Sequence, residues 1–394
     1  MFQKRTDTSQ AVSRYLGVTS TFGAGIFTVL LAFSSMAQGD ELIFSARVMG
    51  PVSNIYGVSA DKALRKITEN IRWRDIDADV SVQGTVVFSS NRETDQSIDI
   101  HRRSESFDLY VTDGRGVITA LTDTPQNEML PRFSPDGTRV AFVRARRQLV
   151  LLELASRRER LLYEAGEILD FDWAPDGSAV AMAARDRQRG VILQLHCDAD
   201  CLAGPLNPQV LKQYPRLQHS DAIQAVDDEV SDFGSVDHLR WSPGGKTLAF
   251  IFHPDGQAAR SLHLLSLESG ESARISDESQ QVQSPLSWSQ DGDSLLYAAL
   301  VNYRFYFDET AQKKVYQGAM QIFRSELNGK VQRLTDNTVA ARAPVFVGEN
   351  QIAYLQADQL AARQYALVMR DLDVGSERTV FDAVTPESRL VVRR

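Results

Sequence analysis

One short line of sequence recurs along this chain, and it constrains the fold more than any other feature. Each copy holds an aromatic or apolar residue, a tight turn of the Ser-Pro-Asp-Gly type and then a short apolar strand. Proline presets φ at the first central position of such a turn, and glycine accepts the positive φ that follows. The line therefore predicts a β-hairpin. Clear copies lie at 133–142, 173–182, 241–250 and 288–297, and degenerate copies at 80–88 and 346–354.

The strand after each turn is a nearly continuous apolar run, as at 140–143 and 248–252. Such a run is typical of a strand that is covered on both faces. Each copy continues with another apolar segment and a last short strand, which often closes with Leu-Thr-Asp, as at 121–123 and 334–336. Four short strands in each repeat are typical of a β-propeller blade.

The number of turns gives the number of repeats, and six turns predict six blades. The steps between turns are 53, 40, 68, 47 and 58 residues, and they exceed the usual blade of about 40 to 50 residues where loops are inserted. We place these insertions at 197–234 and 302–317. At the last turn, asparagine is the non-glycine residue that best tolerates a left-handed conformation. The turn positions are Gly84, Gly137, Gly177, Gly245, Gly292 and Asn350.

The two ends of the repeat region complement each other. Residues 41–47, 54–58 and 65–68 match the last three strands of a blade that lacks its inner strand, and 388–393 is a strand left over after the last blade. We expect this C-terminal strand to supply the missing one, because that closure removes two open sheet edges. The predicted fold is an all-β, six-bladed propeller of four-stranded antiparallel blades over 38–394, closed by the C-terminal strand joining the N-terminal blade.

The repeated Trp/Phe-Ser-Pro-Asp-Gly line resembles the repeat of TolB-type β-propellers, and the resemblance covers residues 41–394. It implies a non-catalytic periplasmic scaffold that binds a protein or peptide partner. Residues 38–41 leave no room for the α/β domain that precedes the TolB propeller, and no Gly-x-Ser-x-Gly elbow of the propeller peptidases is present. Fold alone does not fix function. Two other classes stay open, a hydrolase or lyase acting on a carbohydrate or related polymer, and a sensor of a small ligand or metal.

The N-terminus has the pattern of a secretory signal. Three basic residues precede an apolar stretch at 22–33, and 35–37 gives a small-x-small cleavage site. This pattern predicts a signal peptide over 1–37 and a periplasmic or secreted mature protein. An uncleaved anchor is the alternative, although the apolar stretch is short for a membrane span.

The charge of the chain argues against one class of partner. Its formal net charge is −8, whereas a protein that binds nucleic acid normally has a strongly basic balance. Residues 1–37 carry three basic residues and one acidic residue, so the mature chain would carry −8 − 2 = −10. We expect a monomer with an envelope protein or peptide as its partner, no nucleic acid, and no stable membrane insertion after signal cleavage.

The only two cysteines, Cys197 and Cys201, lie four positions apart. In an oxidising compartment this spacing favours a disulfide that pins a loop. Metal ligation would need further ligands, of which only His196 is close. A redox pair would normally have two intervening residues, and here there are three.

The sequence offers few candidates for catalysis. Its six histidines show no metal-ligand spacing, and we expect no catalytic residue, cofactor or metal. Acidic residues between 227 and 237 could bind Ca²⁺, but their spacing does not match the known calcium loop, and a solvated loop is the alternative. Asp170, Asp172 and Asp237 could act as acid and base if they faced the central channel.

One face of the propeller is predicted to collect arginine and aromatic side chains. The turn between the second and third strands of every blade emerges on that face, and such side chains are enriched where partners bind. Acidic neighbours such as Asp186, Asp308 and Glu309 could instead neutralise the face, and the aromatic residues could pack under their own hairpin. The predicted partner-binding residues are Tyr303, Arg304, Phe305, Tyr306, Phe307, Tyr316, Arg144, Arg146, Arg147, Arg185, Arg187 and Arg189.

Overall fold

The repeats form strands throughout the part of the chain that the computed structural model describes, and this part contains no helix. Accordingly, no helix among these residues has the length and apolar character of a membrane span. All of them lie within one unit, Met36–Arg394, and the predicted signal peptide lies outside them. The described residues are 41–50, 52–59, 63–92, 106–113, 116–186, 189–197, 206–215, 234–253, 260–310 and 312–393.

The strands follow the predicted order along the chain. The first fourteen are β1 (Glu41–Met49), β2 (Val52–Ser59), β3 (Leu64–Lys66), β4 (Asp75–Val80), β5 (Val86–Ser90), β6 (Asp108–Thr112), β7 (Ile118–Ala120), β8 (Glu128–Phe133), β9 (Arg139–Arg144), β10 (Gln148–Glu153), β11 (Glu159–Glu164), β12 (Glu167–Trp173), β13 (Ala179–Arg185) and β14 (Arg189–His196). The others are β15 (Gln209–Pro215), β16 (Ser235–Trp241), β17 (Thr247–His253), β18 (Ser261–Ser266), β19 (Ser272–Arg274), β20 (Gln281–Trp288), β21 (Ser294–Asp308), β22 (Lys313–Glu326), β23 (Val331–Arg333), β24 (Ala340–Phe346), β25 (Gln351–Ala357), β26 (Tyr365–Asp371), β27 (Glu377–Val384) and β28 (Val391–Arg393).

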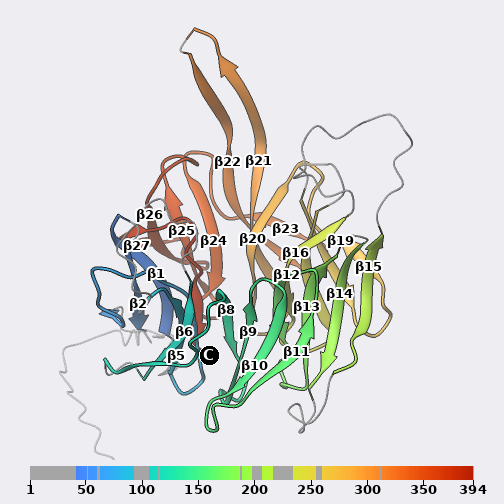
Figure 1. Ribbon diagram of the computed structural model, residues 1–394. Coiled ribbons are helices and arrows are strands. Elements are labelled where there is room, and N and C mark those ends of the chain that lie inside the picture. The colour runs from blue at the N-terminus through green and yellow to red at the C-terminus, as the bar shows by residue number, and fades with distance from the viewer. Residues whose placement is uncertain are drawn as a thin grey trace, which may run out of the picture. The chain divides into compact units, whose positions relative to one another are not determined.

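The strands pair in quartets. Five sheets hold four consecutive strands each, β4–β7, β8–β11, β12–β15, β16–β19 and β20–β23. A sixth sheet holds the quartet β24–β27 and the quartet β28-β1-β2-β3, which one residue pair joins, Ala46 with Val384. The first strands of neighbouring quartets contact one another around the ring, and β8 meets β12 through Arg132 and Asp170 (Figure 1). We call these first strands the inner strands.

The predicted propeller of four-stranded antiparallel blades is confirmed, and so is its closure by the C-terminal strand. Six quartets begin with a hairpin at the predicted turns. The closing quartet, β28-β1-β2-β3, has no such turn because its first two strands come from opposite ends of the described chain. It stands beside the six turn-bearing blades, so the described strands make seven quartets.

The turns have the conformation that the repeated line predicts. At five of them the glycine N–H donates to the carbonyl three residues earlier, as from Gly137 to Ser134 at 2.8 Å. These five glycines have φ between +71° and +85°, where any other residue would be strained. Asn350 differs, since it is not among the described residues with positive φ. Its side chain donates to Asp373 at 2.6 Å instead, so the left-handed conformation expected at Asn350 is wrong.

The Leu-Thr-Asp line has a structural reason of its own. The last strand of a blade is short, and the Thr or Ser hydroxyl that follows it accepts a hydrogen bond from the third strand. The ladder therefore continues for one more bond beyond the end of the strand. These bonds run from Ile55 N–H to Thr68 (2.9 Å), Leu109 to Thr122 (2.9 Å), Leu262 to Ser276 (3.0 Å) and Ile322 to Thr335 (3.0 Å).

Ring closure depends on a very short strand. β28 pairs with β1 only at Glu41, Leu42 and Ile43. Two residues further along β1, the Ser388 hydroxyl accepts a hydrogen bond from the Ser45 N–H at 3.1 Å and donates one to the Ser45 carbonyl at 2.5 Å. A side chain thus satisfies the main-chain groups of β1 where β28 has not begun.

Tryptophans at the ends of inner strands fill the space between blades. The indole N–H of Trp173 donates to the carbonyl of Arg132 in the preceding blade at 3.3 Å, and that of Trp288 donates to Arg240 at 3.2 Å. A large apolar side chain with one satisfied donor suits such a site. Because successive side chains of a strand alternate in direction, the residue before each tryptophan faces the central channel.

Candidate functional site

Charged side chains line one side of the channel. The residue before the tryptophan, or before its counterpart in other blades, alternates in sign over four successive inner strands. In β20 and β24 the same position holds Ser287 and Val345, so the charges lie on one side of the ring. The four charged residues are Asp79 of β4, Arg132 of β8, Asp172 of β12 and Arg240 of β16.

Asp170 lies two positions before Asp172 in β12 and is bonded to two of these four residues. It accepts hydrogen bonds from Arg132 at 2.6 Å, from Arg240 at 2.9 Å and from the Leu239 N–H at 3.1 Å. The residue is 2% exposed. Burial alone would raise the pKa of Asp170, but the two guanidiniums hold it well below its usual value. This carboxylate is therefore ionised and saturated with partners.

Four carboxylates form hydrogen bonds between one blade and the next. On both β4 and β12 two aspartates stand two positions apart, and each accepts a main-chain N–H of the following inner strand. Two of them, Asp170 and Asp172, are residues that the sequence also allowed as general acid and base. The bonds run from Leu130 N–H to Asp77 (3.3 Å), Phe133 to Asp79 (2.8 Å), Leu239 to Asp170 (3.1 Å) and Trp241 to Asp172 (2.8 Å).

His238 lies among these charges and is neutral. Burial, followed by the positive charge of Arg240, lowers the pKa of His238 to about 4. Its Nδ1 lies 2.8 Å from the carboxylate of Asp170. Its Nε2 is buried and has no hydrogen-bond partner among the described residues. A neutral ring that donates from Nδ1 leaves an acceptor at Nε2.

A cavity of about 490 Å³ lies at the end of the inner strands where the repeated turns are found. We call it the channel cavity, and its volume is typical of ligand sites, which measure roughly 300–1,000 Å³. Its charged groups are Asp172, Arg240 and Arg389. Proline, tryptophan and aliphatic side chains form most of the remaining wall, among them Pro135, Pro175, Pro243, Pro285, Pro344, Trp241, Trp288, Leu286 and Val345.

A second cavity, of about 580 Å³, lies where the inner strands begin, beside Ile76 and Asp77 of β4. Arg389 lines this cavity as well as the channel cavity. Its Nη2 is 3.8 Å from Asp79, at the outer limit of an ion pair, and its Nη1 is buried without a hydrogen-bond partner among the described residues. Burial lowers the pKa of Arg389 and raises that of Asp79, so neither ion is well satisfied.

Several arginines of the predicted basic face belong to a repeated ion pair. An acidic residue at the start of an inner strand pairs with an arginine at or just beyond the end of the second strand of the same blade. These arginines hold the first hairpin of the blade together, and Arg144 is only 14% exposed. The pairs are Asp75 with Arg92 (2.7 Å), Glu128 with Arg144 (2.7 Å) and Glu167 with Arg185 (2.5 Å).

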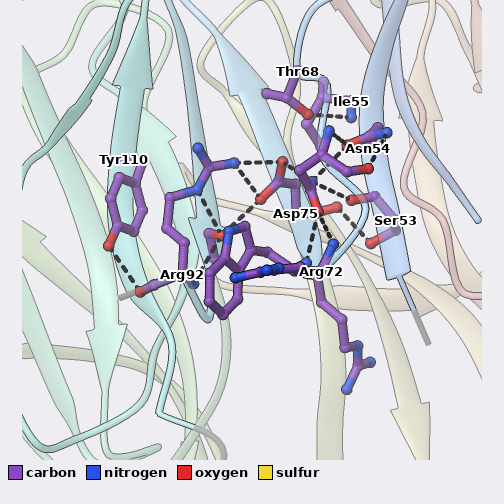
Figure 2. Close-up of polar contacts among 12 residues, drawn as sticks. Ser53, Asn54, Ile55, Thr68, Arg72, Asp75, Arg92 and Tyr110 are labelled. Carbon is purple, nitrogen blue, oxygen red and sulfur yellow. Dashed lines mark hydrogen bonds and ion pairs between the residues drawn. The ribbon is translucent and has the colours of Figure 1, made fainter. Parts of the chain in front are cut away.

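Figure 2 shows the first of these pairs in its setting. The fully buried carboxylate of Asp75 accepts two hydrogen bonds from Arg92, at 2.7 and 2.8 Å, and one from Ser90 at 2.7 Å. The Ser53 hydroxyl, in the closing quartet, donates to the Asp75 carbonyl at 2.9 Å. The Tyr110 hydroxyl donates to the Arg92 carbonyl at 3.1 Å. This network joins the closing quartet to the next blade.

Three other arginines of the predicted face, Arg146, Arg147 and Arg189, are more exposed. Arg146 is 76% exposed and pairs with Glu167, and Arg187 lies outside the described residues. Exposed ion pairs contribute about 0–1 kcal/mol, so these arginines could exchange an internal partner for an external one at small cost. The two other pairs are Arg147 with Glu164 (3.7 Å) and Arg189 with Asp186 (3.9 Å).

The predicted aromatic loop is the end of a long hairpin. β21 and β22 continue past the blade as a two-stranded arm over 302–317, paired from Arg304 with Gln317 to Asp308 with Lys313 (Figure 1, top). Tyr306 is 44% exposed and Phe307 50%. Neighbours in a strand point to opposite faces, so the arm exposes aromatic surface on both. The side chains of the other predicted aromatic-loop residues, Tyr303, Arg304, Phe305 and Tyr316, lie outside the described part of the chain.

The other predicted features are only partly described. Cys197 is buried and disulfide-bonded, and Cys201 lies outside the described residues, so their pairing stays a prediction. The same holds for most of the acidic stretch, while Asp237 lies 3.2 Å from Arg260. No group of three or more His, Cys, Asp or Glu residues that could hold a metal ion occurs in the described part of the chain.

The sequence indicated only part of the charged channel. Asp170 and Asp172 were candidates for it, whereas Arg132, Arg240 and Arg389 were not. One signal was present, because the residue before the aromatic or apolar position alternates in charge over four successive repeats. An alternation between repeats, rather than within a strand, indicates groups that meet around a common axis.

Comparison with known proteins indicates the same fold. No family model matches the chain. A curated relative named "Uncharacterized peptidase YuxL", of Bacillus subtilis, is 49% identical over 57 residues, which are 14% of this chain and 8% of that protein. A puromycin-hydrolyzing peptidase of Mycobacterium tuberculosis matches with a TM-score of 0.59 at 12% identity, over 89% of this chain and 53% of that one. An oligogalacturonate lyase in complex with manganese matches with a TM-score of 0.55 at 13% identity, over 88% and 86%.

A TolB from Acinetobacter baumannii is also similar, with a TM-score of 0.48 at 13% identity, over 90% of this chain and 82% of that one. The chain is a β-propeller in fold, as the repeated line predicts. Identities this low show the fold alone. The peptidase and the lyase share the fold but differ in activity, so likeness in fold leaves the function open.

Proposed function

We propose that this protein is a non-catalytic scaffold of the cell envelope that binds an extended segment of a protein or peptide in the channel cavity. The make-up of the cavity wall carries the proposal. Prolines of three repeated turns, Pro135, Pro175 and Pro243, offer apolar surface that loses little freedom on binding. The few charged groups on one side would orient the segment. The predicted signal peptide supports the location.

The contacts of the channel carboxylates favour a scaffold over an enzyme. A general acid and base need protons that they can exchange with a substrate. Asp170 is saturated by two arginines and a main-chain N–H. Asp77, Asp79 and Asp172 each accept a main-chain N–H of the next blade. All four therefore have a structural task that catalysis would disturb.

The arm is our candidate for a second contact with the partner. Its exposed Tyr306 and Phe307 are aromatic residues, which are enriched where partners bind. The arm projects from the face where the inner strands begin, opposite the channel cavity, so a partner would have to reach both faces of the propeller to contact both sites. We place the stronger contact in the cavity, because a concave apolar site excludes water more completely than a two-stranded arm does.

A substitution that fills the cavity tests the proposal. Pro243→Trp places an indole at the half-exposed rim, and Gln290→Trp places one at the same position of a turn that does not line the cavity. Phage-displayed random dodecapeptides are selected on the wild type and then titrated on both variants. We expect binding to Gln290→Trp but not to Pro243→Trp. Equal binding to both variants would contradict a cavity site.

A direct assay tests the non-catalytic part. The protein is incubated with oligogalacturonate, and unsaturated product is followed by its absorbance, with Asp172→Asn as the control. We expect no turnover. Turnover that disappears in Asp172→Asn would replace the scaffold with the alternative function, a hydrolase or lyase acting in the channel.

A further inference from the structure

Arg389 occupies a special place in the channel. Of the described residues, it alone lines both the channel cavity and the cavity at the start of the inner strands. The residue therefore lies where the two spaces approach each other. It directly follows Ser388, whose hydroxyl is bonded to β1, and Leu390 on its other side is buried. The main chain on both sides of Arg389 is thus anchored.

The guanidinium of Arg389 has unused donors. Nη1 is buried and has no hydrogen-bond partner in the described part of the chain. The nearest carboxylate, Asp79, is 3.8 Å from Nη2 and already accepts the Phe133 N–H at 2.8 Å. By contrast, Arg240 is bonded to Asp170 at 2.9 Å. A buried donor without an acceptor is costly, and a ligand oxygen would remove that cost.

The two cations that line the channel cavity differ in how they are compensated. Arg240 is bonded to Asp170 at 2.9 Å, whereas Arg389 lies 3.8 Å from Asp79, the nearest carboxylate. Arg389 is therefore the cation of the cavity that a ligand anion would best satisfy. The planar fork of a guanidinium also matches the two oxygens of a carboxylate.

We infer that Arg389 is the receptor for a carboxylate of the bound peptide, with the apolar residues next to that carboxylate packed against Pro285, Pro344 and Val345. This inference rests on the proposed function and names the ligand group that the cavity recognises. The carboxylate can be the C-terminus of the partner or the side chain of an aspartate or glutamate. Both offer the same two oxygens.

The test uses two pools of random tetrapeptides, one with a free C-terminal carboxylate and one ending in a carboxamide. Each pool is passed over the immobilised full chain, and the retained peptides are identified by mass spectrometry. We expect the carboxylate pool to be retained at least about tenfold more strongly than the amide pool. Alternatively, an amide pool enriched in Asp and Glu would identify a side chain as the source. Either preference must disappear in Arg389→Gln.

Two further variants serve as controls for Arg389→Gln. Arg342→Gln removes an arginine of the inner strand β24 that lines neither cavity and whose Nε has no hydrogen-bond partner among the described residues. This variant should retain peptides like the wild type. Arg389→Lys keeps the charge but loses the fork, and it should retain an intermediate amount. Thermal unfolding of each variant shows whether it is folded.

The outcomes separate this inference from the proposed function. One result would be equal retention of peptides with a carboxylate, an acidic side chain or only an amide, which persists in Arg389→Gln and is lost in Pro243→Trp. This result would overturn the carboxylate receptor but not the cavity site. No retention of either pool, or retention unaffected by Pro243→Trp, would overturn both.

Discussion

The hydroxyl of Ser388 bonds both main-chain groups of Ser45, a residue 343 positions earlier in the chain. One side chain thereby extends the pairing between β28 and β1, which otherwise consists of three residue pairs. The same serine precedes Arg389, so the contact that closes the ring also positions the proposed carboxylate receptor. Closure of the ring and the proposed binding in the channel thus depend on two adjacent residues, Ser388 and Arg389.

Ser388→Ala should lower the free energy of unfolding by about 1–3 kcal/mol, because it leaves a buried N–H and a buried carbonyl of Ser45 without a partner. Urea unfolding followed by tryptophan fluorescence measures the change. Ser45→Ala is the matched control, since it keeps both main-chain bonds and loses only the contact between the two hydroxyls at 3.0 Å. Equal losses for both variants would contradict the role given to Ser388.

Asp170→Asn should be among the most destabilising single substitutions in the chain. It removes the charge that compensates Arg132, whose side chain is 4% exposed. Breaking a buried pair from one side costs about 3–5 kcal/mol. Chemical denaturation gives the value, with Asp358→Asn at an exposed position as the control. A loss below about 1 kcal/mol would mean that Arg132 finds other partners.

His238 should make stability fall on acidification. Its pKa is about 4 in the folded protein and 6.5 as a free side chain, so between these values the unfolded chain binds a proton that the folded chain does not. Stability is therefore lost as the pH falls from 6.5 to 4, by about 3 kcal/mol at most.

Melting temperatures of the wild type and of His238→Asn, measured from pH 7.5 to pH 4, isolate this contribution. The asparagine amide can replace the Nδ1 donor but does not titrate. Burial raises the pKa of Asp77 and Asp79, which acts in the opposite direction, but the effect is common to both proteins and cancels in the difference. Parallel profiles for the two proteins would show that His238 is not the titrating group.

Tyr306→Ala combined with Phe307→Ala should leave stability unchanged within about 0.5 kcal/mol, because both side chains lie on the exposed arm. Differential scanning calorimetry measures it. A loss of about 3 kcal/mol or more, as for buried aromatic residues, would instead support the interpretation that they pack under their own hairpin. Partner binding that weakens without loss of stability would support the arm as a second contact.

The repeated line predicted the architecture because each part of it has a local physical cause. Glycine at positive φ, as at Gly137, and the hydroxyl of Thr122 or Thr335 act within their own blade. Local causes can be recognised in a single repeat. The closing quartet carries no turn between its first two strands, so a count of turns could not include it.

The channel and the arginine pairs depend on contacts between residues that are apart in sequence, which is why they were harder to predict. Asp170 meets Arg132 and Arg240 from blades on either side, 38 and 70 positions away. Arg144 was expected on an exposed basic face, yet Glu128 at the start of the same blade binds it. The acidic neighbours that neutralise this face were weighed, but their register with the arginines becomes visible only once the strands are paired.

Closure through Ser388 also fixes an order of events during synthesis. Until the ribosome has released that serine, β1 lacks the partner for one of its edges, although more than three hundred residues of the ring have already been made. Such an edge can pair with another chain. The first of the described strands to emerge is thus the last to gain its partner, and its edge stays open for as long as translation of the other blades takes.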